Sequence, residues 1–111
     1  GGIMEGAARG AREAGGTVIG ILPGESAADA NEFVDIVIPT GMGEARNILV
    51  IRTADVVLAF PGTYGTLTEM AFARLFEKPL ISVQAWKLGE EVTQVEDPVE
   101  AAKLAMKLAA E

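Results

Sequence analysis

The sequence predicts an α/β fold in which mostly parallel strands alternate with helices. Within residues 55–69 an unbroken apolar run meets a Gly-rich turn and then helix-forming residues, which is typical of a strand, a tight loop and a helix start. A second apolar run at residues 80–83 follows at the spacing of a right-handed βαβ unit. No repeat, low-complexity tract or linker interrupts the 111 residues, so a single domain spanning residues 1–111 is expected.

The first half of the chain predicts one helix and two strands. A helix over residues 4–14 would be capped by Gly15-Gly16, and five small or apolar side chains share its inner face: Met4, Ala7, Ala8, Ala11 and Ala14. Residues 17–22 and 33–38 are apolar runs that end at prolines, as expected of buried strands. The segment between them, residues 25–32, is polar and predicts a loop.

The second half predicts the βαβ unit and two further helices. Residues 45–53 have helical spacing, residues 56–60 form the most strand-like run, and residues 66–76 predict the crossover helix before the strand at 80–83. Residues 84–96 predict irregular structure and contain the only tryptophan, Trp86. The last helix opens on an N-cap aspartate, Asp97, followed by Pro98 and by Glu100 as the capping-box partner.

Charge and composition exclude several classes of partner and chemistry. With 16 acidic and 9 basic residues the net charge is -7, so neither nucleic acid nor an anionic membrane is an expected partner. The sequence has no cysteine and no histidine, so no metal site is predicted and any catalysis must use carboxylates, Arg, Lys, Tyr or backbone groups. No run approaches the roughly 20 apolar residues that span a bilayer, and we expect a soluble, cytoplasmic protein.

The Gly-rich turn predicts a phosphate site. The first N–H groups of a helix lack intrahelical acceptors, and the positive end of the helix dipole favours an anion beside them. Gly62, Gly65 and Thr66 supply such a turn and helix start, although the loop lacks the lysine of a Walker A motif. The alternative is that both glycines serve only the turn geometry or close packing.

Three segments carry a resemblance to a known superfamily. The signature resemblance lies in nine residues, Pro61-Gly62-Thr63-Tyr64-Gly65-Thr66-Leu67-Thr68-Glu69. They resemble the PGGxGTxxE signature of the LONELY GUY-type proteins, also known as lysine decarboxylase-like, with Thr63 in place of the second glycine. The opening residues 1–11 and the Gly-Met-Gly-Glu-Ala-Arg-Asn segment at 41–47 are more similar to the branch of molybdenum-cofactor carrier proteins. The resemblance covers essentially the whole chain.

The resemblance implies a Rossmann-like three-layer α/β fold with a mostly parallel sheet, N-terminally incomplete. Family members begin with a strand, a helix and a strand before the Gly-rich turn on which this chain starts. The resemblance therefore implies a fragment, a truncated reading frame or a chain completed by a partner. We also expect a homodimer or higher oligomer, because the apolar residues 48–51 exceed what one helix can bury against one sheet.

The resemblance also implies site residues. In the phosphoribohydrolase branch an arginine before the signature strand and the glutamate that closes the signature are the catalytic pair, and Arg46 and Glu69 occupy those positions, with Asn47 replacing the usual lysine. The alternative is an ion pair that holds two helices or a dimer interface. Phosphate or ligand contacts are implied for nine residues: Gly1, Gly2, Asn47, Pro61, Gly62, Thr63, Tyr64, Gly65 and Thr66. Tyr64 either stacks on a ligand or faces solvent.

The functional hypothesis is the binding of a phosphorylated ligand at residues 61–66, as in a carrier. The ligand would be a nucleotide or the molybdenum cofactor. One alternative is a nucleoside 5'-monophosphate phosphoribohydrolase of the cytokinin-activating type, in which Arg46 and Glu69 act on the N-glycosidic bond. A second alternative is an inactive truncated remnant. A lysine decarboxylase has no support, because no lysine stands in a pattern typical of a pyridoxal-phosphate site.

Overall fold

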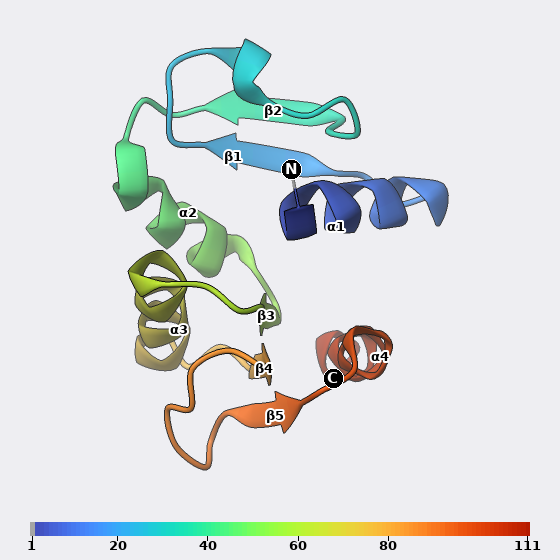
Figure 1. The fold of residues 1–111 in the computed structure, drawn as a ribbon, viewed down its shortest axis with the longest axis vertical. Helices are drawn as coiled ribbons and strands as arrows, with labels where there is room; N and C mark the ends of the chain where they lie inside the picture. The colour runs from blue at the N-terminus through green and yellow to red at the C-terminus, as the bar shows by residue number, and fades with distance from the viewer. Residues whose placement is uncertain (1) are drawn as a thin grey trace. The chain divides into compact units, whose positions relative to one another are not determined.

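The computed structural model describes residues 2–111 of the chain. Within this range the chain forms four α-helices and five short strands, joined by loops and short 3-10 turns (Figure 1). The chain forms two compact units, Gly1–Arg46 and Asn47–Glu111. Every strand pairing in residues 2–111 is parallel. This confirms the predicted α/β class. None of the helices in this described range is long and apolar enough to cross a membrane.

The first unit contains one helix and a two-stranded parallel sheet. Helix α1 (Gly2–Glu13) ends at Gly15, whose φ of 85° suits glycine, and Gly16 donates to the carbonyl oxygen of Ala11 at 2.8 Å. Strand β1 (Ile19–Leu22) pairs with β2 (Ile36–Pro39), and a short 3-10 turn, η1 (Ala27–Asp29), interrupts their connection. The predicted C-cap and both predicted strands are therefore confirmed, with later starts for the strands.

The predicted inner face of α1 is wrong in most of its members. Only Ala8 is buried, while Met4 is 67% exposed. Three isoleucines of the adjacent strands, Ile19, Ile36 and Ile38, are exposed as well. Two strands and one helix offer too little surface to cover one another's apolar side chains, so helical periodicity alone overestimates the core of this unit.

The second unit is a three-layer sandwich. Its sheet has the order β3 (Val57–Ala59), β4 (Leu80–Val83) and β5 (Thr93–Val95). Helices α3 (Tyr64–Leu75) and α4 (Pro98–Ala109) lie on opposite faces of this sheet (Figure 1). Helix α2 (Arg46–Thr53), which follows a 3-10 turn, η2 (Gly43–Ala45), crosses the boundary between the units.

Alternation along β4 divides the core of this unit into two clusters. Leu80 belongs to the cluster that contains Met70 of α3, while its neighbour Ile81 belongs to the cluster that contains Ala101 of α4. Successive side chains of a strand point to opposite faces, so each face of the sheet is sealed by one helix. Burial on both faces explains why β4 is the strand whose predicted and observed bounds coincide.

Two predictions for the second unit need correction. Residues 84–96 are not all irregular, because Thr93–Val95 forms β5 and pairs with β4. This strand is short and two of its three residues are exposed, so neither its length nor its hydrophobicity reveals it in the sequence. Helix α3 begins at Tyr64, two residues before the predicted start at Thr66. Glycine has a low helix propensity, so Gly65 in the first turn makes the sequence of this turn look non-helical.

Candidate functional site

The signature loop ends at a helix N-terminus with unpaired backbone donors. Thr63 is the N-cap residue of α3, and its side chain makes no capping hydrogen bond. Its carbonyl oxygen accepts the first α-helical bond, from the N–H of Leu67 at 3.1 Å. The N–H groups of Tyr64, Gly65 and Thr66 therefore lack acceptors within the helix. Three donors and the positive end of the helix dipole meet at the start of α3, an arrangement that suits an anion.

Close packing explains the first glycine of the loop. A Cβ atom at Gly62 would lie 3.0 Å from the Cβ of Thr66 and would overlap its hydroxyl oxygen. Gly62 is not among the described glycines with positive φ, so the absence of a side chain matters here and not the backbone angle. Thr63, which replaces a family glycine, has a φ of -98° that any residue can adopt. Thr63 therefore needs no left-handed φ at this position.

Trp86 contacts this loop, and the sequence reasoning did not assign it to the site. Its indole Nε1 donates to the carbonyl oxygen of Thr63 at 3.2 Å. Its ring stacks on Tyr64 with centroids 6.3 Å apart and an interplanar angle of 21°. One feature of the sequence could have indicated this contact. The only tryptophan follows the buried strand β4, and the carboxyl ends of parallel strands lie at the same edge of the sheet, where the signature loop also begins.

Glu69 and Asn47 both belong to the second unit. Glu69 is partly buried on α3, and Asn47, on α2, is only 2% exposed. Each takes part in an interaction with its surroundings. Their assignment to catalysis and to ligand binding remains a prediction.

Arg46 belongs to the first unit, whereas the signature loop and Glu69 belong to the second. Its Nη1 donates to the carbonyl oxygen of Ile21, near the end of β1, at 2.8 Å. Its Nε is buried and has no hydrogen-bond partner. A buried N–H of a charged group without an acceptor is costly, which makes Arg46 the most suggestive cation of this unit for binding an anionic group.

The loops that follow β1 and β2 are joined at the same edge of their sheet. Gly41 donates to the carbonyl oxygen of Gly24 at 2.8 Å, and Gly43 donates to that of Pro23 at 2.9 Å. Both donors have positive φ values, 64° and 59°, which explains the glycines of the Gly-Met-Gly segment. At the start of the chain, Gly2 begins α1, and Gly1 lies outside the described residues.

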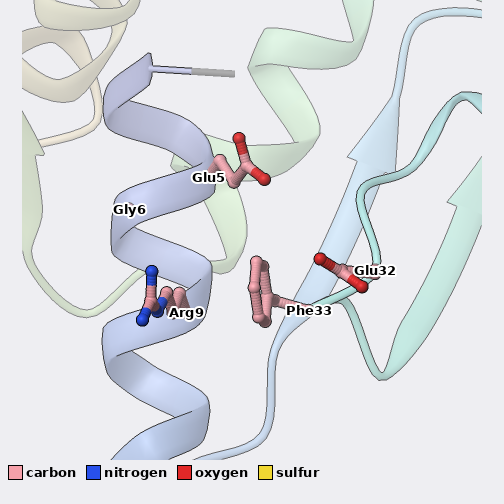
Figure 2. Close-up of a pocket in the computed structure, with 5 residues that line it drawn as sticks. All are labelled: Glu5, Gly6, Arg9, Glu32 and Phe33. Carbon is pink, nitrogen blue, oxygen red and sulfur yellow. The ribbon is translucent and has the colours of Figure 1, made fainter.

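Two surface hollows are lined by other residues. One, of about 380 Å³, is in the first unit and is lined by Glu5, Gly6, Arg9, Glu32 and Phe33 (Figure 2). The other, of about 590 Å³, is in the second unit and is lined by Gln84, Lys87, Gln94, Val95 and Glu96. Neither includes a residue predicted for the site. Within residues 2–111 no three or more His, Cys, Asp or Glu side chains gather in a way that could hold a metal ion.

Comparisons with known proteins match one family model and several individual proteins. The SLOG cluster4 family matches residues 1–110. A protein of Archaeoglobus fulgidus is 39% identical over 101 residues, which are 91% of this chain and 66% of that protein, so the chain spans slightly less than two thirds of this relative.

Two solved structures are also similar. The molybdenum cofactor binding protein from the phototrophic bacterium Rippkaea orientalis matches with a TM-score of 0.85 and 34% identity, covering 95% of this chain and 70% of that one. The molybdenum cofactor carrier protein from Chlamydomonas reinhardtii has a TM-score of 0.85 and 33% identity, covering 99% and 73%. The Rossmann-like resemblance found in the sequence is therefore confirmed.

Proposed function

The chain belongs to the SLOG cluster4 family, and we propose that it binds a phosphorylated small molecule at residues 61–66 and acts as its carrier. The observation that carries the proposal is the start of α3. There the N–H groups of Tyr64, Gly65 and Thr66 have no acceptor within the helix, and the N-cap side chain of Thr63 supplies none. A phosphate oxygen would satisfy these donors beside the positive end of the helix dipole.

Arg46 is the cation of the first unit that we propose for binding an anionic group. Its buried Nε needs an acceptor, and its Nη1 is already held by the carbonyl oxygen of Ile21. An arginine so anchored loses little conformational freedom when it binds an anion. A phosphate or another acidic group is an acceptor of the required kind.

The molybdenum cofactor, whose pterin carries a phosphate, is the ligand we consider first. The names of the Rippkaea and Chlamydomonas proteins support this choice. Tyr64, which is 77% exposed beside the loop, offers a ring face on which a pterin or a nucleobase could stack. A nucleotide is the second ligand class, since it combines a phosphate with a planar heterocycle in the same way.

Calorimetric titration with inorganic phosphate, a purine nucleoside 5'-monophosphate and purified molybdopterin tests the proposal. Tyr64→Glu places a carboxylate on the first helical residue and should abolish binding of all three. The equally shaped, uncharged Tyr64→Gln loses the same ring contact with Trp86, so it should bind phosphate more weakly than the wild-type protein and much more tightly than Tyr64→Glu. A carboxylate in the first turn also favours the helix, and both variants lose the same ring, so a difference in affinity between them reports the charge. Equal affinities of the two variants for phosphate would contradict the proposed site.

A phosphoribohydrolase is the second candidate function. Arg46 and Glu69 supply a guanidinium and a carboxylate, which are the groups that could hold a phosphate and stabilise a developing sugar cation. Glu69 is partly buried on α3, the helix whose N-terminus we assign to the phosphate. Release of free base from nucleoside 5'-monophosphates, lost in Glu69→Gln, is the signature of this activity.

We also propose that the chain forms a homo-oligomer. Ile48 and Leu49 of α2 are 36% and 38% exposed, while Ile51 on the same helix is buried. Apolar side chains left on a helix surface favour a protein contact. Sedimentation equilibrium tests this point, with Leu49→Lys expected to shift the population towards monomer.

A further inference from the structure

We propose that Trp86 is a positioning residue that holds the N-terminus of α3 in the geometry that binds the ligand. The inference rests on the proposed function, because it assigns Trp86 a role in the same phosphate site. Trp86 lies 23 residues after Thr63, in the loop that follows β4, and it contacts the signature loop although it is not part of it. Nothing in the family resemblance pointed to it.

The contact falls on the atom that starts the helix. The carbonyl oxygen of Thr63 accepts from the Leu67 N–H at 3.1 Å and from the Trp86 indole at 3.2 Å. The side chain of Thr63 adds no cap of its own. The indole therefore fixes the peptide group that carries the first of the three free N–H groups, that of Tyr64, and it does so without occupying any of those donors.

A buried serine in turn fixes Trp86. Ser82, the third residue of β4, is fully buried. Its hydroxyl accepts from the N–H of Ala85 and donates to the carbonyl oxygen of Trp86, both at 3.2 Å. These two bonds close the turn after the strand and set the main chain from which the indole extends. The sheet is thus connected to the start of α3 through two successive hydrogen bonds, from Ser82 to Trp86 and from Trp86 to Thr63.

The aromatic contact adds a second connection. Tyr64, the first residue of α3, stacks with Trp86, which is 37% exposed. Such a pair is worth more than its buried area alone. Because Tyr64 itself carries one of the free N–H groups, the ring contact limits motion of a ligand-binding residue. A loop held in advance loses less conformational entropy when phosphate binds.

Two arms of one experiment test the inference. Hydrogen exchange of the peptide spanning residues 61–70 measures the order of the loop, and titration with inorganic phosphate measures its affinity. Trp86→Phe keeps a ring and removes the indole donor, so we expect faster exchange of the Leu67 amide and phosphate affinity about two- to tenfold weaker, the range expected for one hydrogen bond. Ser82→Ala should act in the same direction.

Gln84→Ala is the matched control in the same loop. The Gln84 amide donates to the carbonyl oxygen of Glu96 at 3.2 Å and does not contact Thr63, so its loss should change neither readout. The wild-type protein also carries its own reporter, because Trp86 is the only tryptophan. Its emission should change saturably with phosphate.

The outcomes separate this inference from the proposed function. Wild-type binding together with unchanged exchange or unchanged affinity in Trp86→Phe would overturn the positioning role and leave the phosphate site standing. Equal effects of Gln84→Ala and Trp86→Phe would also overturn it, because a general loosening of the loop would then explain both. Absence of phosphate binding by the wild-type protein would overturn the proposed function and the positioning role together.

Discussion

The side chain of Thr66 occupies the space that a Cβ atom at Gly62 would need, with 3.0 Å between that Cβ and the Cβ of Thr66. The contact joins the first glycine of the signature loop to the first turn of α3. It explains how the loop can turn into the helix so tightly that three backbone donors face the same direction. The glycine and the threonine of the signature are thus coupled through packing.

We expect Gly62→Ala to destabilise the protein by about 1–3 kcal/mol, the usual cost of forcing an extra methyl group into a packed site. Most of that cost should disappear in the Thr66→Ala background, where the obstructing side chain is absent. Urea denaturation of the four members of this double-mutant cycle measures the coupling. Equal costs of Gly62→Ala in both backgrounds would show that the contact with Thr66 is not the cause.

Arg46→Ala should weaken phosphate binding by roughly ten- to a hundredfold, because a hydrogen bond to a charged group is worth about 1.5–3 kcal/mol. Arg12→Ala is a matched control, since Arg12 also donates from Nη1 to a carbonyl oxygen of the first unit, that of Glu32, at 2.8 Å. Isothermal titration of both variants compares them. A comparable loss in Arg12→Ala would attribute the effect to net charge.

The carrier account expects no release of free base from nucleoside 5'-monophosphates, by the wild-type chain or by Glu69→Gln. Chromatographic detection of adenine, guanine and other bases measures this directly. Base release by the wild-type chain that disappears in Glu69→Gln would establish the phosphoribohydrolase alternative. Release that persists in the variant would remove Glu69 from that mechanism.

The N-cap of α4 offers a test of the fold itself. A carboxylate oxygen of Asp97 accepts from the Val99 N–H at 3.1 Å. Asp97→Ala should therefore cost about 1 kcal/mol of stability, while Asp97→Asn, which keeps an acceptor, should cost only a few tenths. Thermal unfolding of the two variants compares them. Equal destabilisation would mean that charge, and not the cap, stabilises this end of the helix.

Local chemistry explains which parts of this fold the sequence predicts well. The Asp97-Pro98 start of α4 and the apolar β4 carry their signals within a few residues, and both are confirmed. Strand β5 depends on pairing with β4, a contact between segments 12 residues apart at Ile81 and Thr93, and its own residues give little hydrophobic signal. Tertiary pairing decides such strands.

The candidate site also contains features that local sequence predicts and features that depend on tertiary contacts. The unpaired donors of Tyr64, Gly65 and Thr66 follow from the strand, loop and helix order that the sequence displays. The contact of Trp86 with Thr63 joins residues 23 positions apart, and no spacing rule predicts it. The orphaned Nε of Arg46 likewise depends on burial, which the sequence does not reveal.

The central claim is that phosphate binds at the N-terminus of α3. Titration of the isotopically labelled protein with inorganic phosphate, followed by the amide resonances, tests it most directly. We predict saturable shifts of the amides of Tyr64, Gly65 and Thr66. Saturable shifts confined to other residues, or none at millimolar phosphate, would contradict the account.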